Sequence, residues 1–314
     1  MKKVFKYSFE AGLHVENCDN ILFPVSALNS FNKRDFSEFH LYCIVAYHKL
    51  YFDHNSLKIA KTTFQVNIFY MVEGKKTFLN TPYPFAFSED VDTIECPFPH
   101  NKILIKYKDG YIDDITAQKL FLWHMGQFEK NPHFEILYIG QAYGDGNRSA
   151  IERLQNHSTL QEILSKASSE YSDKDIYLLL LSINTSLLMG FNGIDKEFTK
   201  SEIESQNHMQ EVLTHENKEH QIINITEAAL IHYFKPPYNV TFKENFPCKK
   251  HTSYKDYYTL DYSEYRFSFN SIIFSGATID LFTATARQPG PFDTIYYKLD
   301  NNPNRKTMYD MFTV

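Results

Sequence analysis

The stretch 137–157, "LYIGQAYGDGNRSAIERLQNH", decides the predicted fold of this chain. An apolar run ends at Gly140, two further glycines follow closely, and a charged segment with apolar residues at helical spacing comes next, which predicts a strand, a loop and a helix. The glycines fit neither GxGxxG nor GxxxxGK[ST], so a nucleotide-binding loop is not indicated. The informative residues are therefore at the two ends of the stretch.

The composition is that of a globular protein and excludes several classes. Of 314 residues, 43% are hydrophobic and 16% aromatic, and the net charge is −6, which argues against a surface coated with positive charge to hold nucleic acid. The four cysteines are scattered without a CxxC pair, so neither a disulfide framework nor a zinc ribbon is expected. The longest apolar run is too short for a bilayer, and the N-terminus lacks the apolar core of a signal peptide. We expect a cytoplasmic protein without a membrane partner.

The order of the predicted elements divides the chain into three regions. Residues 1–112 are rich in β-branched and aromatic residues, as is the segment 246–314, and both read as β-rich. Residues 113–245 read as strand, helix, buried strand and helix, with a polar insertion near 189–222. The expected fold class is α+β, with a small mixed core of about three strands and helices between β-rich flanks.

Single residues in the centre carry weak signals when taken alone. Arg153 and His157 are four residues apart, so they share one face of a predicted helix over 149–167, where solvated side chains are common. Glu227 lies in the first turn of a predicted helix over 225–234, where an acidic residue suits the helix dipole. The sequence "HENKEH" misses the HExxH spacing of a zinc protease by one residue.

The ordered set of these residues resembles the GIY-YIG nuclease superfamily. The matching pieces are "YIG" at 138–140, "RLQNH" at 153–157 and "EAALI…PPYN" at 227–239, with the strand "DIYLLLLSIN" (175–184) in the place of the third strand of that fold. The resemblance spans roughly residues 105–242. It implies a phosphodiester hydrolase, that is, an endonuclease of the restriction, phage-defence or mobile-element type.

The resemblance assigns a role to each matching residue. Glu227 would hold Mg²⁺ or Mn²⁺, which acts on phosphate as a Lewis acid, and Arg153 would bind the phosphate through its planar fork of donors. Tyr138 and His157 would hold or deprotonate the attacking water, and Asn239 would fix the geometry of the site after the Pro-Pro turn. The expected partner is DNA, and the oligomeric state stays open, with a homodimer as one option.

The sequence departs from the family pattern in ways that leave alternatives open. No GIY motif precedes Tyr138, so Tyr107 or Tyr111 could supply the first phenol, with Tyr107 as the candidate, and Trp123 is a weaker option for this place in the site. The position of the phosphate-binding arginine is also open. Arg148 is an alternative to Arg153, because it lies closer to the usual spacing from the tyrosine.

The charge of the central segment also departs from that of a nuclease that binds DNA unaided. Residues 135–245 contain nine Lys and Arg against sixteen Asp and Glu, although phosphate contacts dominate affinity for DNA. Basic clusters lie outside the core, at 100–110, 248–251 and 304–307, so the flanks could recognise substrate or a partner, or merely extend the core. The alternative function is a non-catalytic nucleic-acid-binding or regulatory protein that retains the scaffold.

Overall fold

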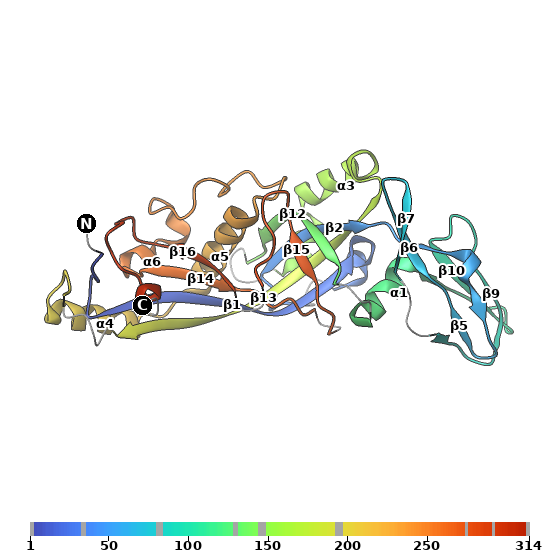
Figure 1. The fold of residues 1–314 in the computed structure, drawn as a ribbon, viewed down its shortest axis with the longest axis horizontal. Helices are drawn as coiled ribbons and strands as arrows, with labels where there is room; N and C mark the ends of the chain where they lie inside the picture. The colour runs from blue at the N-terminus through green and yellow to red at the C-terminus, as the bar shows by residue number, and fades with distance from the viewer. Residues whose placement is uncertain are drawn as a thin grey trace.

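A seven-stranded sheet forms the centre of the computed structural model, which describes residues 3–32, 36–79, 84–127, 131–143, 149–191, 197–273, 276–290 and 293–311. The strand order is β15-β12-β2-β13-β1-β14-β16 (Figure 1). In chain order the strands are β1 (Phe9–Pro24), β2 (Leu41–His48), β12 (His133–Gln141), β13 (Lys174–Phe191), β14 (Glu264–Ser268), β15 (Asp280–Phe282) and β16 (Thr294–Lys298).

The expected small core of about three strands is wrong, because both flanks contribute strands to the same sheet. β1 from the N-terminal region pairs antiparallel with β13 over nearly its whole length, and β14 and β16 extend the sheet beyond β1. β15 adds the other edge next to β12. Strands from both β-rich flanks are thus an integral part of the sheet, and they bury apolar side chains that the central strands alone would leave exposed.

Residues on alternate positions of the central strands pack into two separate apolar clusters, one on each face of the sheet. On β13, Leu178 and Leu180 face one cluster while Tyr177 and Leu179 face the other. This alternation explains why the continuously apolar run in β13 forms a strand that is buried on both faces. The predicted buried strand over 175–184 is present within β13.

Helices cover both faces of the sheet. The first face carries α2 (Ala150–Gln155) and α3 (Ser158–Glu170), whose apolar residues join the cluster of Leu178. The second face carries α5 (Glu219–Phe234), whose apolar residues join the cluster of Tyr177. The remaining helices are α1 (Ala117–His124), α4 (Glu202–Thr214) and α6 (Asp256–Thr259).

Three small sheets lie between β2 and β12 in the sequence and form one end of the elongated molecule (Figure 1). Their orders are β11-β10-β9, β3-β6-β7 and β4-β5-β8. Their bounds are β3 (Tyr51–Phe52), β4 (Lys58–Ile59), β5 (Thr63–Gln65), β6 (Ile68–Val72), β7 (Lys75–Leu79), β8 (Phe85–Ala86), β9 (Val91–Glu95), β10 (Lys102–Tyr107) and β11 (Ile112–Thr116). We call residues 51–116 the outlying sheets.

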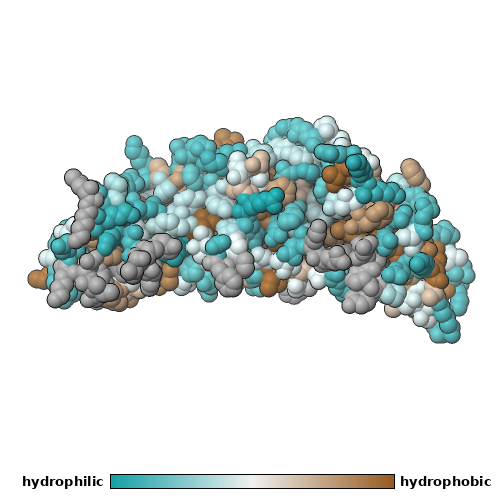
Figure 2. All heavy atoms as spheres, in the orientation of Figure 1, coloured by the Kyte–Doolittle hydropathy of each residue, from teal (hydrophilic) through white to brown (hydrophobic). Residues whose placement is uncertain are grey.

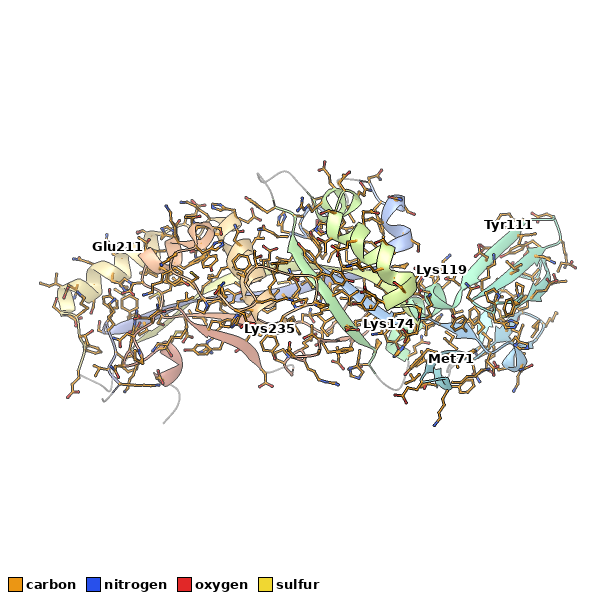
Figure 3. All side chains as sticks on the ribbon, turned by 90° about the horizontal axis from the view of Figure 1, so that it is seen from above. Met71, Tyr111, Lys119, Lys174, Glu211 and Lys235 are labelled. Carbon is orange, nitrogen blue, oxygen red and sulfur yellow. The ribbon has the colours of Figure 1, made fainter. Side chains whose placement is uncertain are left out.

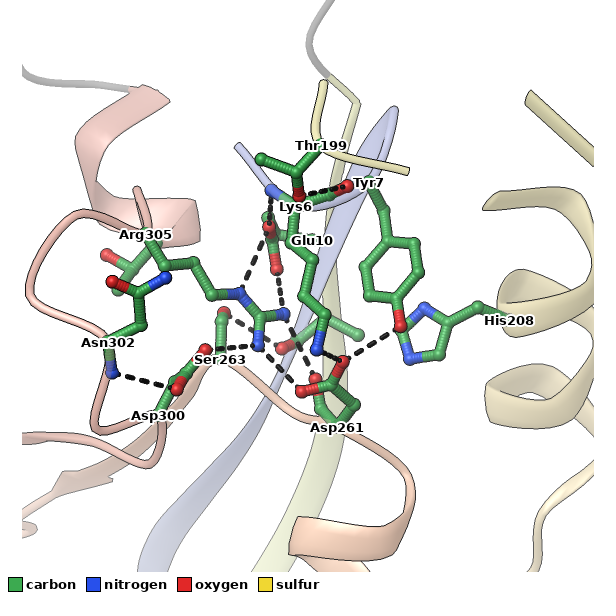
Figure 4. A network of polar contacts seen from close by, with 12 residues as sticks. Lys6, Tyr7, Glu10, Thr199, His208, Asp261, Ser263, Asp300, Asn302 and Arg305 are labelled. Carbon is green, nitrogen blue, oxygen red and sulfur yellow. Dashed lines mark hydrogen bonds and ion pairs between the residues drawn. The ribbon is translucent and has the colours of Figure 1, made fainter. Parts of the chain in front are cut away.

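A buried ionic network joins the two terminal regions of the chain near α4 (Figure 4). The guanidinium of Arg305 donates to Glu10 Oε2 at 2.6 Å, to Asp261 Oδ1 at 2.8 Å and to Asp300 Oδ2 at 2.9 Å. Arg305 is 2% exposed and Glu10 is fully buried. Because buried charges must be paired, this network fixes the C-terminal segment against β1.

Hydrophilic residues cover most of the face shown in Figure 2, and apolar residues form small separate groups on it. Within the described part of the chain, no helix combines the length and the apolar character needed to span a membrane.

Candidate active site

Two tyrosines lie side by side on neighbouring strands of the large sheet. β12 pairs antiparallel with β2, and Gly140 stands opposite Tyr42. A shift of register between Ile136 and Tyr138 places Tyr138 on the same face as Tyr42, with the ring centroids 6.3 Å apart. Such bulges often re-aim side chains near functional sites. Tyr42 is therefore the partner of Tyr138 that the sequence did not reveal.

Gly140 provides the space that the ring of Tyr42 occupies. A Cβ atom at this position would lie 2.6 Å from Tyr42 Oη and 2.7 Å from Tyr138 Cε1, well inside van der Waals contact. Because Tyr42 is only 1% exposed, its ring has no room to move away. The glycine of "YIG" is thus required by the close approach of the two phenols.

Arg153 reaches this pair from α2. The hydroxyl of Ser149 caps the helix by accepting from Glu152 N at 3.2 Å, which sets the orientation of the single turn and a half that follows. The side chain of Arg153 hydrogen-bonds to Tyr42, and its charge acts on Tyr138 and Glu227. The alternative Arg148 lies outside the described residues.

The prediction that His157 shares a helix with Arg153 is wrong. α2 ends at Gln155, and His157 is the N-cap of α3, with Nδ1 accepting from Leu160 N at 3.1 Å. The ring lies 5.0 Å from that of Tyr138 and 5.7 Å from that of Tyr42. Burial, assisted by the charge of Arg153, lowers the pKa of His157 to about 4, so the imidazole is neutral near pH 7.

The capping bond fixes the tautomer of His157. A neutral imidazole has one donor and one acceptor nitrogen, and Nδ1 already accepts a backbone N–H. The proton therefore resides on Nε2, which can donate to a ligand but cannot take a proton.

Glu227 lies in the middle of α5 and not in its first turn, because the helix begins at Glu219. The helix dipole therefore does not account for it. The backbone N–H and the side chain of Gln141, at the end of β12, hydrogen-bond to the carboxylate. Burial nevertheless raises the pKa of Glu227 to about 7, against the opposing effects of Gln141 and Arg153. A carboxylate held in this way is typical of functional sites.

Asn239 joins the turn after α5 to the strand that carries Tyr138. Its Oδ1 accepts from Ile139 N at 2.9 Å and its Nδ2 donates to Ile139 O at 2.8 Å. The amide is 5% exposed, so both bonds are shielded from water. Lys235 ends α5 in the left-handed conformation, and the two prolines that follow direct the chain toward β12.

Tyr107 lies elsewhere in the molecule. It belongs to β10 in the outlying sheets, where its ring contacts Tyr111 at 5.6 Å. Figure 3 places Tyr111 near the tip of the elongated molecule, well beyond Lys174 at the start of β13. Trp123, on α1, is 57% exposed and does not join the group either. The structure thus replaces Tyr107 with Tyr42 as the residue beside Tyr138.

The donor set at Glu227 fits a hard, strongly hydrated cation. Among the described residues no cluster of three or more His, Cys, Asp or Glu side chains could enclose a metal ion. Mg²⁺ does not need such a cluster, because it commonly binds one or two carboxylates together with waters and substrate phosphates. Glu227, lying beside Arg153 and the two phenols, offers that single carboxylate.

The lowered pKa of His157 predicts a loss of stability in mild acid. A histidine whose folded pKa is depressed binds fewer protons than in the unfolded chain, so its contribution is present above pH 6.5 and is lost as the pH falls toward 4. Between pH 7.5 and 5 the loss is about 2 kcal/mol in the free energy of unfolding. Urea unfolding of wild type and of His157→Asn measures it.

The asparagine in that variant keeps an N-cap acceptor but does not titrate. His157→Asn should therefore lose less stability than wild type over the same pH interval. An identical pH dependence in the two proteins would contradict the assignment to His157.

Comparison of the chain with protein-family models, with curated proteins and with solved structures gave no match.

Proposed function

We propose that this protein is a metal-dependent endonuclease that hydrolyses phosphodiester bonds in DNA. The observation that carries the proposal is the meeting of Tyr42, Tyr138, Arg153, His157 and Glu227 at one place, although they come from β2, β12, α2, the α3 cap and α5. The likeness to GIY-YIG nucleases lies in this site, with Tyr42 in the place of the first tyrosine.

Each side chain has a task that its surroundings suit. Arg153 binds a non-bridging phosphate oxygen and offsets the charge that develops there. Glu227 holds the divalent cation, which supplies Lewis-acid stabilisation of the phosphate and of the leaving oxygen. Asn239 keeps β12 in register with the turn that follows α5.

Tyr42, Tyr138 and His157 hold the attacking water in place and do not deprotonate it. Burial raises the pKa of Tyr42 and of Tyr138 above the ordinary value of a phenol, so both stay protonated near neutral pH. His157 presents an Nε2–H donor, for the reason given above. These three groups orient the water and the phosphate, which is worth large factors when the reacting atoms are aligned.

Removal of one hydroxyl tests this assignment. Tyr42→Phe should lower the rate of Mg²⁺-dependent plasmid cleavage roughly 100-fold, because Arg153 and the water lose a shared partner. Tyr107→Phe is the matched control and should cleave at the wild-type rate, since Tyr107 lies in the outlying sheets.

The same assay tests the function itself. Purified wild type is incubated with plasmid DNA and Mg²⁺ or Mn²⁺, beside Arg153→Ala and Glu227→Ala. Cleavage that survives both substitutions would point to a contaminant. Binding of DNA without cleavage by wild type would favour a regulatory protein that keeps the scaffold.

A further inference from the structure

A basic segment follows the candidate site directly. Residues 235–255 contain five lysines and one glutamate, in a chain whose net charge is −6. Lys249, Lys250 and Lys255 are exposed. A local run of this kind is the charge pattern that nucleic-acid contacts require.

The same segment lines an open surface pocket of about 540 Å³, which we call the 241–251 pocket. A volume of this size accommodates a small organic group. The residues that matter for its chemistry are Thr241, Phe242, Glu244, Phe246, Cys248 and His251.

Two aromatic rings form an open corner of the pocket. The rings of Phe242 and His251 lie 4.8 Å apart at 54°. One face of His251 stacks on Tyr254, and its Nδ1 bonds to Ser253 Oγ at 2.5 Å, so the ring is fixed in orientation. Phe242 adopts a left-handed backbone conformation with φ of 65°, which is uncommon for a bulky residue and is often found at functional sites.

Phe246 forms the floor of the pocket. It is 5% exposed and is held edge-on by Tyr297 at 4.8 Å and by Tyr254 at 5.9 Å. Rigid aromatic walls of this kind suit a flat, unsaturated ligand that can stack.

The charges around the pocket indicate how such a ligand would be oriented. The carboxylate of Glu244 lines the cavity and is paired with Lys235 at 2.9 Å. An anionic group inside the cavity would meet this carboxylate, whereas the amino group of a base could donate to it. Lys249 and Lys250 are exposed at the surface. Lys249 Nζ lies 3.8 Å from Asp300 Oδ1, so a phosphate bound there would replace that long ion pair.

The pocket lies close to the site along the chain. Asn239 is bonded to Ile139, the residue after Tyr138, and Thr241 follows two residues later, within about 7 Å along the backbone. Glu227 and Phe234 are separated by roughly 10 Å along α5. Figure 3 shows Lys235, at the end of this helix, in the middle of the molecule.

We propose that the 241–251 pocket is a subsite that takes an unpaired base of the substrate strand, stacked on Phe242 and His251, while Lys249 and Lys250 bind the adjoining phosphates. The inference rests on the proposed nuclease function and deepens it. An aromatic wall can stack only on a base that has left the duplex, so the preferred substrate contains a single-stranded segment.

Cys248 reports on the pocket without any substitution. The thiol lines the cavity, and Cys96, in the loop between β9 and β10, is an internal control of similar partial burial. Alkylation of each cysteine of the full-length protein by iodoacetamide is followed by mass spectrometry. A single-stranded DNA of about 20 nucleotides, longer than ordinary single-strand sites, is added without metal to prevent cleavage.

We expect the single strand to slow alkylation of Cys248 at least fivefold and to leave Cys96 unchanged. Blunt duplex of the same sequence should protect Cys248 far less. Equal alkylation of Cys248 with and without saturating single strand would overturn the proposal, and so would equal protection by duplex. Protection by a deoxynucleoside monophosphate at the same concentration would overturn the assignment to a strand.

Variants extend the test to affinity, measured by fluorescence anisotropy of the labelled strand. Phe242→Ala should weaken binding roughly 5- to 100-fold, the range for loss of one base–aromatic stack, and Lys250→Ala should lower the salt slope by about 1. Phe78→Ala and Lys75→Ala, exposed in β7, are the matched controls and should bind as wild type does.

The two proposals fail in different ways. Protection of Cys248 without any metal-dependent cleavage by wild type would retain the pocket and remove the nuclease function. Cleavage that depends on Glu227, together with no protection of Cys248, would retain the function and remove the pocket.

Discussion

Glu227→Gln should lower the rate of Mg²⁺-dependent DNA cleavage roughly 1000-fold and leave the fold intact. Glutamine keeps the shape and the hydrogen-bonding partner at Gln141, but it carries no charge for the cation. Stabilisation of transition-state charge is commonly the largest single contribution in such reactions. Initial rates on supercoiled plasmid at saturating Mg²⁺ measure the effect.

The stability of the same variant separates a functional carboxylate from a structural one. Burial raises the pKa of Glu227 to about 7, so at pH 8 the folded protein carries a charge that its surroundings disfavour. Because the folded pKa of Glu227 lies above its ordinary value of 4.5, the free energy of unfolding falls as the pH rises from about 4.5 to about 7, and this loss is complete at pH 8. Glu227→Gln should therefore match or exceed the urea midpoint of wild type at pH 8.

Glu219→Gln is the matched control on the same helix. Its side chain is 60% exposed at the start of α5, and both cleavage and stability should stay at wild-type levels. A Glu227→Gln variant that is strongly destabilised would indicate that the carboxylate holds the fold together, contrary to its assignment.

The sequence indicated four members of the site and missed Tyr42 for a physical reason. Tyr42 and Tyr138 become neighbours only because β2 pairs with β12, and the outlying sheets separate these strands along the chain. Local periodicity reports strands but not which strands pair. The glycine of "YIG" is needed because the ring of Tyr42 packs against Gly140, and this reason becomes visible only when the position of Tyr42 is known.

The prediction of one helix over 149–167 is wrong at His157, where the chain breaks into two helices. Apolar spacing continues from Ile151 through Leu160 to Ile163, so the pattern alone favours an unbroken helix. His157 instead uses Nδ1 to cap α3, and a side chain that bonds to the backbone competes with helix continuation. This break is what brings the imidazole beside the two phenols.

The number of strands in the large sheet could not be predicted from local sequence patterns either. The β-rich character of the flanks was evident, but their strands could have formed separate domains. The long antiparallel pairing of β1 with β13, and the addition of β14 beside β1, come from contacts far apart in sequence. Arg305, the residue that ties the last segment to β1, looked like part of an ordinary basic cluster.

Arg305→Met should destabilise the protein by about 3–5 kcal/mol, the cost of leaving a buried charge without its partner. Methionine fills similar space but donates no hydrogen bond to Glu10, which is fully buried. Urea unfolding at pH 8 measures the loss. Arg287→Met, at an exposed position beside β15 on the opposite edge of the sheet, should change stability by less than about 0.5 kcal/mol.

The pH dependence and a second substitution identify the cause of that loss. Burial raises the pKa of Glu10 even in the presence of Arg305, so without the guanidinium the folded variant prefers a protonated Glu10. Stability from a raised carboxyl pKa is present at low pH and lost as the pH rises, so Arg305→Met should be closer to wild type at pH 5 than at pH 8. Glu10→Gln in the same chain should recover part of the loss at pH 8. If the double variant is no more stable than Arg305→Met alone, the destabilisation comes from lost packing of the C-terminal segment and not from the unpaired carboxylate.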